Sequence, residues 1–348
     1  MGSERKRFAF EIAAFVFVVS FIAFFAAKRG SGGLGEAAEL SEQRLMMGTV
    51  VSVTVFTHDE ERGREALEAA FVEIARVEAL TSAYAEGSEV SRIAERKPGE
   101  EHFFIDREVA GVLERALHFS SVSGGAFDVT VAPLVALWTG PNGIRVPSAA
   151  AIRGALGKVD YRKLSVTPGT GALELPVGMS VDLAGIAKGH AVDRAIRVLR
   201  LRGIEAAIVD AGGDIGFFGS PPRGGAWRVG VKHPREDGLL GVLLIERGSV
   251  ATSGDYQRFA IVDGVRYHHI LDPKTGRPVS GVMSVTITAA RVIDADALAT
   301  TVFVLGAEKG MALVEETDGV EAVIVTGGET VERTLVSTGL KERFIASR

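Results

Sequence analysis

Short β-rich runs crowd the middle of this chain, between positions 206 and 290. Gly, Pro and Asp separate these runs, and no long helical pattern comes between them. Short strands broken by turn-forming residues are typical of an antiparallel sheet. Because the strands cluster instead of alternating with helices, the pattern favours the α+β class over a doubly wound parallel sheet. The predicted strands cover 206–209, 227–231, 242–245, 259–262 and 282–289.

Helical patterns flank this region on both sides. Over 60–80, apolar residues such as Ala66 and Val77 recur on one face, with charged residues between them. We expect Gly203, which suits the position after a helix, to end the helix that begins at 186. The sequence therefore predicts one α+β domain over 44–348. Its further helices are predicted over 107–121, 129–138, 186–201, 293–305 and 308–316, with additional strands over 50–57 and 320–325.

The N-terminal segment differs from the rest of the chain. Residues 8–27 carry a single charge, Glu11. A helix of this length spans about 30 Å, which is enough to cross the core of a bilayer. The basic cluster at 5–7 favours a cytoplasmic N-terminus, although the basic pair at 28–29 weakens that assignment. We therefore predict a membrane anchor over 1–29.

Two alternatives to an uncleaved anchor remain open. A cleavable signal peptide is the first, but Phe25 is bulky for the small-residue motif that a cut after Ala27 requires. A buried core helix is the second. The Gly-rich stretch that follows predicts a flexible linker over 30–43.

The absence of cysteine and the acidic balance exclude several classes of site. With no cysteine in 348 residues, the chain has no disulfide, thiolate metal site or cysteine nucleophile. Any metal must therefore be bound by oxygen or by histidine nitrogen. The net charge is −5, and no basic stripe with interleaved aromatic residues is present, so nucleic acid is not an expected partner.

A carboxylate and a hydroxyl lie one helical turn apart in the segment 294–301. On a helix, Asp296 and Thr300 point to the same side, and the alanines between them leave room for a ligand. Two such oxygens suit a hard cation such as Mg²⁺. The same spacing also fits a purely structural arrangement, with an acid near the helix N-terminus and a threonine bonded to its own backbone.

Two adjacent histidines precede a predicted turn that starts at Asp272. Placed at the end of a strand, either His268 or His269 could act as a general base. A structural alternative is one exposed and one buried histidine. A metal-binding pair is a further possibility, but no third ligand at zinc-like spacing is visible.

Small-residue segments supply further candidates. Asp182 could cap the N-terminus of the helix that carries Lys188, and a helix start with a lysine is a common place for phosphate. Gly212 and Gly213 allow a close approach to a ligand, or only a tight turn. The loop at 124–128 could place Phe127 against a planar ring, or simply bury it in the core. Together these segments describe a phosphate and metal site for a nucleotide.

Six short segments occur in a fixed order along the chain. They are MGT at 47–49, GAFDVT at 125–130, DLAGIAKG at 182–189, AGGD at 211–214, HILDPKTG at 269–276 and ADALAT at 295–300. In this order they resemble the ApbE family of FAD:protein FMN transferases. The resemblance covers about 45–306, which is most of the chain after the predicted anchor.

The resemblance implies a fold, an activity and partners. The implied fold is α+β, with a T-fold-like antiparallel sheet and packed helices. The implied activity is the transfer of FMN from FAD to a Thr or Ser hydroxyl of a target protein, with Mg²⁺ and with release of AMP. Implied acceptors carry a short Ser/Thr motif and include subunits of Rnf- and Nqr-type electron-transfer complexes. This partner set suits an enzyme tethered by one span to the outer, periplasmic face of the cytoplasmic membrane.

The resemblance also assigns roles to individual residues. The implied FAD contacts are Met47, Tyr84, Ala126, Phe127, Asp128, Asp182, Lys188 and Ile270. The implied Mg²⁺ ligands are Asp296, Thr300 and the carbonyl of Gly185, while His269 is the candidate base.

The chain also departs from the family's pattern. Members are often lipoproteins held by an N-terminal cysteine, which this chain lacks, so its apolar segment must serve as the anchor. The residues around Tyr84 match the family only loosely. Other functions left open are FAD hydrolysis to FMN and AMP, flavin binding without catalysis, and a scaffold with a vestigial site.

Overall fold

A computed structural model describes residues 37–140 and 143–347. The predicted anchor over 1–29 lies outside these residues. Among the residues that are described, no helix is long and apolar enough to cross a membrane. Strand β1 begins at Ala38, so the prediction of a flexible linker is wrong for residues 38–43. This strand is polar and lies at the edge of the sheet that the described residues form. An edge strand tolerates polar side chains, and the sequence of β1 lacks an apolar strand pattern.

One eight-stranded sheet runs through the molecule, and each of its strands pairs antiparallel with its neighbours. The predicted α+β class with an antiparallel sheet and packed helices is confirmed. Its likeness to a T-fold stays a prediction. In sheet order the strands are β1 (Ala38–Met46), β2 (Thr49–Thr57), β8 (Ala206–Ala211), β9 (Ile215–Phe218), β12 (Gly248–Gly254), β17 (Val282–Ala289), β18 (Glu321–Gly327) and β19 (Val331–Val336).

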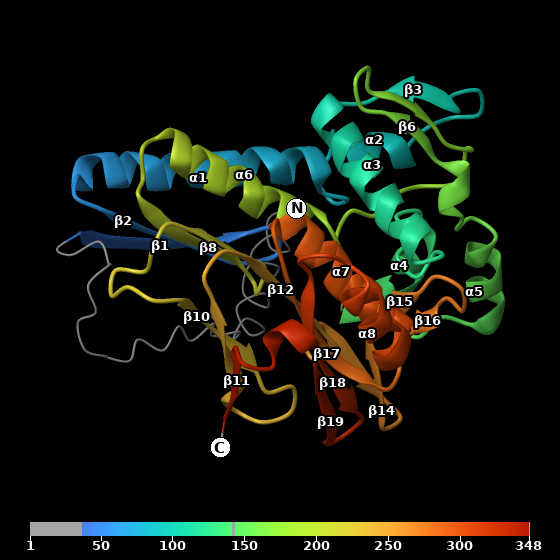
Figure 1. Cartoon of the computed structure of the whole chain (residues 1–348). Helices are drawn as coiled ribbons and strands as arrows, with labels where there is room; N and C mark the ends of the chain where they lie inside the picture. Colours follow the sequence, from blue (N-terminus) through green and yellow to red (C-terminus); the bar gives the residue numbers. More distant parts are fainter. Residues whose placement is uncertain (1–36, 141–142, 348) are drawn as a thin grey trace, which may run out of the picture.

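The helices form two groups (Figure 1). Helices α1 and α6 run side by side over the half of the sheet that contains β2 and β8, and α7 and α8 cover the half that contains β17 and β18. Helices α2 to α5 form a lobe beside α7. The helices are α1 (Glu60–Thr81), α2 (Glu89–Ala94), α3 (Arg107–Val122), α4 (Ala132–Trp138), α5 (Ala149–Leu156), α6 (Ala187–Leu201), α7 (Val292–Leu305) and α8 (Ala307–Glu315), with 3₁₀ turns at Tyr161–Lys163 and Thr338–Leu340.

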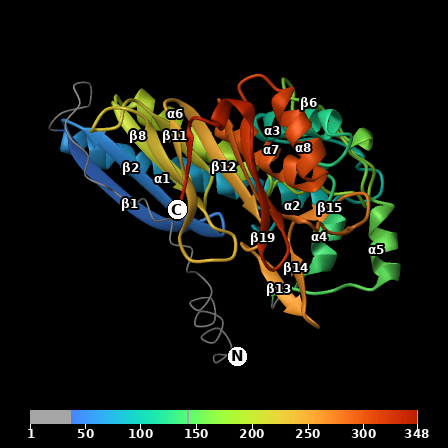
Figure 2. The same ribbon diagram turned by 60° about the horizontal axis from the view of Figure 1, so that its bottom comes forward.

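Smaller sheets complete the fold. The three-stranded sheet of β10, β11 and β20 packs on the sheet face opposite α1 and α6. The hairpin of β13 and β14 projects from the body of the molecule (Figure 2). These strands are β10 (Trp227–Lys232), β11 (Leu239–Ile245), β20 (Phe344–Ala346), β13 (Phe259–Val262) and β14 (Val265–His268), and the shortest are β3 (His102–Phe104), β4 (Thr139–Gly140), β5 (Gly143–Ile144), β6 (Ser165–Thr167), β7 (Ala172–Glu174), β15 (Leu271–Asp272) and β16 (Arg277–Pro278).

The alternation of side chains along a strand builds a core on each face of the main sheet. In β2, Val51, Val53 and Val55 face α1 and α6, whereas Phe56 turns to the other face and packs near Trp227 of β10. Such alternation follows from the pleat of a strand. The sheet is thus buried on both sides, which explains why all eight residues of β17 are buried.

Most predicted elements are confirmed, with bounds shifted by a few residues. The helix predicted over 129–138 begins only at Ala132. Two central strands, β9 and β12, were not predicted. Strand β12 consists of small residues between Gly248 and Gly254, a composition typical of a turn. It is a strand because β9 and β17 pair with it on either side.

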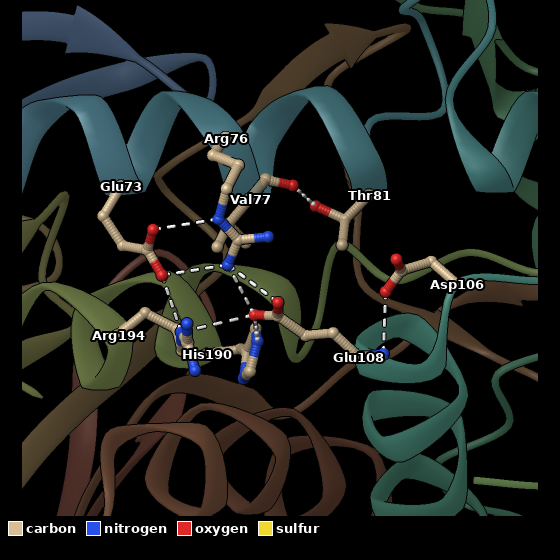
Figure 3. Close-up of polar contacts among 8 residues, drawn as sticks. All are labelled: Glu73, Arg76, Val77, Thr81, Asp106, Glu108, His190 and Arg194. Carbon is tan, nitrogen blue, oxygen red and sulfur yellow. Dashed lines mark hydrogen bonds and ion pairs between the residues drawn. The ribbon is translucent and has the colours of Figure 1, made fainter. Parts of the chain in front are cut away.

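Four charged side chains and His190 join α1, α3 and α6 in one network (Figure 3). Glu108 of α3 accepts hydrogen bonds from His190 Nε2 of α6 at 2.7 Å and from Arg76 Nη2 of α1 at 2.7 Å. Glu73 of α1 accepts from Arg76 Nε at 2.9 Å and from Arg194 Nε of α6 at 2.7 Å. The network fixes the first turns of α6 against two other helices.

We predict that Glu73→Gln lowers the free energy of unfolding at pH 7 by roughly 1–2 kcal/mol, because it weakens the charged hydrogen bonds from Arg76 and Arg194. Hydrogen bonding to Arg76 lowers the pKa of Glu73 from 4.5 to about 2. A lowered folded-state pKa stabilises the fold above pH 4.5, and this stabilisation is lost as the pH falls through 2.

Urea unfolding at several pH values measures this effect. The difference between wild type and Glu73→Gln should therefore shrink between pH 5 and pH 2. Glu65→Gln, at an exposed position of the same helix, is the control. A difference that stayed constant over this pH range would contradict the prediction.

Candidate functional site

The N-termini of α6 and α7 stabilise each other where the two helices cross. The backbone N–H of Gly189, in the first turn of α6, donates to Asp296 Oδ2 of α7 at 2.9 Å. In return, Asp193 of α6 accepts from the backbone N–H groups of Val292 and Ile293 at the start of α7, each at 3.0 Å. Neither helix has a capping bond from its own N-cap side chain. Each helix therefore supplies a carboxylate to N–H groups that the other leaves unpaired.

A half-buried lysine between two buried carboxylates forms the centre of the candidate site. Lys188 Nζ contacts Asp214 directly and lies 3.8 Å from Asp296 Oδ1. Asp214 and Asp296 are only 2% and 3% exposed. Burial raises the pKa of both carboxyl groups, and for Asp214 the charge of Asp296 adds to the shift. Burial disfavours the charge of Lys188, but Asp214 and Asp296 outweigh it and raise the pKa of Lys188.

The three residues predicted to bind a metal lie around this cluster. Asp296 and Thr300 are one turn apart on α7, as their spacing predicted. Gly185 lies directly against Thr300, because a Cβ added at Gly185 would be 3.3 Å from Thr300 Oγ1. The same Cβ would lie 3.2 Å from the ring of Phe127. The Ser253 hydroxyl, from β12, is 3.3 Å from Thr300 Oγ1.

This donor set fits a magnesium ion. Its members are a carboxylate, a hydroxyl and a backbone carbonyl, all hard oxygen ligands. The part of the chain that the structure describes contains no group of three or more His, Asp and Glu side chains able to hold a metal. A cation at Asp296 would therefore depend on neutral oxygens and on a bound substrate for its other ligands.

Asp182 is not the N-cap of α6, so that prediction is wrong. The helix begins at Ala187 after Ile186, and Asp182 instead accepts from the Ala184 backbone N–H at 2.7 Å within the preceding turn. The backbone N–H groups of Ile186 and Ala187 both donate to the Leu183 carbonyl in this turn. Burial raises the pKa of Asp182, while the positive charge of Arg258 opposes the shift.

Two glycine-containing turns meet beside the lysine cluster. Met47 and Gly48 form the turn between β1 and β2 and have positive φ angles of 52° and 69°. Met47 donates its backbone N–H to Glu78 Oε1 at 2.8 Å and packs against two parts of the core. The neighbouring Thr49 lies against Gly212, where a Cβ would be only 2.3 Å from Thr49 Oγ1. Gly212 thus permits the close approach that places the following turn, and with it Asp214.

The predicted ring-binding loop is buried and internally bonded. Ala126 and Phe127 are both 5% exposed. Asp128 accepts from the backbone N–H and hydroxyl of Thr130 at 2.8 and 2.6 Å, and from the Tyr161 backbone N–H at 3.1 Å. The Asp128 carboxylate therefore shapes the loop. Phe127 lies nearest to the cluster because it contacts Gly185.

The two histidines differ sharply. His268 is buried, donates Nε2–H to the Val279 carbonyl at 2.7 Å, and accepts the Ile270 backbone N–H at Nδ1 at 3.2 Å. His269 is half-buried, and its Nδ1 lies 3.3 Å from the Arg258 carbonyl. A carbonyl can only accept, so Nδ1 carries the proton and Nε2 keeps a free lone pair. Burial and the charge of Arg258 lower the pKa of His269 to about 3, which keeps the ring neutral.

Ile270 and Tyr84, two of the predicted FAD contacts, differ from the other candidates in their surroundings. The Ile270 carbonyl also accepts the Val279 backbone N–H at 3.1 Å, so both backbone groups of Ile270 already have partners within the protein. Tyr84 lies in the loop after α1 and is 80% exposed. Within the described part of the chain, its backbone N–H donates to Ser82 Oγ, and it makes no hydrogen bond with the cluster. The structure therefore brings together the lysine, acid and glycine residues of the prediction but not Tyr84.

Sequence reasoning did not select Asp214, Ser253 or Arg258 as site residues. Asp214 belongs to the AGGD segment, so its position was signalled, but its pairing with Lys188 joins residues 26 apart in the sequence. Ser253 lies in the unpredicted strand β12. Arg258 precedes the β13–β14 hairpin, and no pattern in the sequence marks it.

Comparisons with known proteins agree on one family. A sequence model of the ApbE family matches residues 47–324. A Treponema pallidum protein named FAD:protein FMN transferase is 36% identical over 331 residues, covering 90% of each chain. A Klebsiella pneumoniae protein of the same name is 33% identical over 309 residues, covering 87% of this chain and 93% of that one.

Solved structures agree as well. The crystal structure of the ApbE protein from Thermotoga maritima has a TM-score of 0.80 and 35% identity, covering 88% of this chain and 99% of that chain. The apo structure of the flavinyl transferase ApbE from Pseudomonas stutzeri has a TM-score of 0.79 and 29% identity, covering 91% and 100%.

We predict that Gly189→Ala destabilises the protein by roughly 2 kcal/mol or more, because overpacking at a helix crossing forces the backbone apart. A Cβ there would lie 2.5 Å from the Val292 carbonyl oxygen and 2.7 Å from the Ile293 Cα. Gly111→Ala in α3 is the matched control, because a Cβ there meets nothing within 4 Å. That change should be neutral or stabilising by up to about 1 kcal/mol. Equal midpoints of thermal unfolding for the two variants would contradict the prediction.

Proposed function

The chain belongs to the ApbE family, and we propose that it transfers FMN from FAD to a Ser or Thr hydroxyl of a target protein. The observation that carries this proposal is the meeting of Lys188, Asp214 and Asp296 with Thr300 and Gly185 at the crossing of α6 and α7. A site with buried charges and hard oxygen donors suits a pyrophosphate and a divalent cation.

The proposed reaction exchanges one oxygen substituent on the phosphorus of the FMN half for another. The hydroxyl oxygen of the acceptor bonds to the phosphorus of the FMN half, and the bond from that phosphorus to the bridging oxygen breaks. AMP leaves with the electron pair of that bond, and the hydroxyl proton passes to a base. The product is a phosphoester between FMN and the acceptor side chain. Because the chemistry is group transfer between oxygens, the protein contributes mainly positioning and charge stabilisation.

Asp296, Thr300 and the Gly185 carbonyl are the residues that would hold Mg²⁺. Bound there, the ion would neutralise charge on the pyrophosphate and on the departing AMP. Asp296 is suited to this role because its second oxygen is held by the Gly189 N–H, which fixes the direction of the carboxylate.

The flavin half of FAD would lie toward the Met47 turn and the loop at 126–128. Phe127 lies in contact with Gly185, so a ring bound beside it would be next to the proposed cation site. Met47 is a flexible apolar side chain in a backbone conformation with positive φ, which is unusual for a residue with a side chain. Tyr84 would join this pocket only if its loop moved toward the site.

His269 is the proposed base. Its fixed tautomer leaves Nε2 with a free lone pair that can accept the hydroxyl proton. Burial, which lowers the pKa of His269, makes it a weaker base than a free imidazole. His268 is excluded from this role because both of its ring nitrogens are engaged in the protein.

The sequence of residues 8–27 supports a further proposal about location. We propose that this apolar segment anchors the enzyme in the cytoplasmic membrane, with the catalytic domain on the periplasmic side. Acceptors would then be membrane-associated proteins with a Ser/Thr motif, such as subunits of Rnf- or Nqr-type complexes. Alkaline extraction of membranes from cells that produce the full chain tests the anchor, and its release into the supernatant would contradict it.

Transfer is tested by co-expressing the full chain with a protein that carries a candidate Ser/Thr acceptor motif. We expect a covalent fluorescent flavin band on the acceptor after denaturing electrophoresis. Asp296→Asn keeps an oxygen for the Gly189 N–H but removes the charge, so transfer should fall by roughly 100-fold or more. Asp318→Asn, at an exposed turn, is the control and should leave transfer unchanged.

Two results would count against this proposal. Normal labelling by Asp296→Asn would remove the metal assignment. Release of AMP and free FMN by the wild type, without any labelled acceptor, would instead favour FAD hydrolysis.

For His269→Ala we expect transfer to slow by roughly 10²–10⁴-fold, the usual contribution of a general base. The affinity for FAD, followed by quenching of flavin fluorescence, should stay within about twofold, because the ring does not hold the dinucleotide in this mechanism. His102→Ala, on the exposed strand β3, is the control. An unchanged transfer rate would exclude His269 as the base.

A further inference from the structure

We propose that Arg258, rather than Lys188, is the side chain that binds the bridging phosphates of the dinucleotide. This inference rests on the proposed function, since it assumes that FAD occupies the site beside the crossing of α6 and α7. It identifies which of the two positively charged side chains near the site is free to bind a phosphate.

The charge of Lys188 is already used within the protein. Its ammonium group contacts Asp214 and lies 3.8 Å from Asp296, and both carboxylates are buried. Because two carboxyl groups of the protein surround it, the ammonium group of Lys188 is already paired and has little charge available for a phosphate. Lys188 therefore holds Asp214 and Asp296 close together beside the proposed cation site. Without the lysine, the two carboxylates would repel each other.

Arg258 has no such partner. None of the ion pairs found among residues 37–140 and 143–347 includes its guanidinium. Its one hydrogen bond from the side chain is long, 3.4 Å from Nη2 to the Gly48 carbonyl. The side chain is exposed, so most of its five N–H donors can reach a ligand.

The position of Arg258 links the two halves of the site. Its Nη2 lies over the β1–β2 turn, where a Cβ added at Gly48 would be 3.0 Å away. Its backbone carbonyl accepts from the backbone N–H of His269 at 3.1 Å and faces Nδ1 of the same residue at 3.3 Å. Arg258 therefore lies between the turn assigned to the flavin and the histidine assigned to the base.

The charge of Arg258 also reaches the other site residues. It opposes the rise that burial causes in the pKa of Asp182. For His269 it is the second cause, after burial, of the lowered pKa, and for Lys188 it reduces the rise in the pKa. All three groups therefore lie within electrostatic range of the guanidinium. A planar guanidinium can bind two oxygens of a phosphate at once, which matches a pyrophosphate better than a single ammonium does.

Binding measurements with Arg258→Gln test this inference. We expect the dissociation constant for FAD to rise on the order of 10- to 100-fold, the usual loss for a hydrogen bond to a charged group. The affinity for riboflavin, which has no phosphate, should not change. The dissociation constant of Arg258→Lys for FAD should lie between that of Arg258→Gln and that of the wild type. Arg228→Gln, at an exposed position of β10, removes the same charge far from the site and should bind both ligands as the wild type does.

The outcomes separate the two proposals. Wild-type protein that binds no FAD would overturn the proposed function and this inference with it. Wild-type binding of FAD together with unchanged binding by Arg258→Gln would overturn this inference alone. An equal loss of FAD and riboflavin binding would also overturn it, because the arginine would then act on the flavin pocket and not on the phosphates.

Discussion

The crossing of α6 and α7 is the contact on which the site depends. Asp193 and Asp296 each accept N–H groups that the other helix leaves unpaired, so the two helix starts cannot move independently. Gly189 makes the crossing possible, because any side chain would meet the backbone of α7. The same bond that fixes the helices directs the Asp296 carboxylate. Structural and chemical roles are therefore combined in one residue.

This arrangement places charges where burial disfavours them. Removing Lys188, Asp214 and Asp296 from water carries a desolvation cost that their mutual attraction offsets only in part, so the cluster is weak evidence for stability. It is better explained by the chemistry of the site. In the proposed mechanism, the carboxylates and the neutral oxygens beside them attract a cation, and the cation in turn attracts the pyrophosphate. The network of Glu73, Glu108 and their partners supports the cluster from outside, because it holds the first turns of α6.

How much the sequence predicts depends on the range of the interaction. The pairing of Asp296 with Thr300 was predictable, since residues four apart on a helix must share a face. The strand over 282–289 was also predictable, because burial on both faces leaves a continuous apolar run. Strand β12 was not, since it is formed of small residues and exists through its neighbours. The contact of Lys188 with Asp214 likewise arises from tertiary folding, and the same holds for the exposed Arg258.

The two adjacent histidines show how strand geometry divides structural from chemical roles. Successive side chains at the end of a strand point to opposite sides, so His268 enters the core while His269 faces the site. The backbone carbonyl of Arg258 then sets the tautomer of His269, because it holds the proton at Nδ1 and leaves Nε2 unprotonated. The side chain of Arg258 leaves the same backbone position toward the β1–β2 turn. In our proposal, Arg258 therefore has two roles: its carbonyl sets the tautomer of His269, the base, and its guanidinium binds the phosphates. The same residue then positions both the base that takes the acceptor proton and the phosphate bond that breaks.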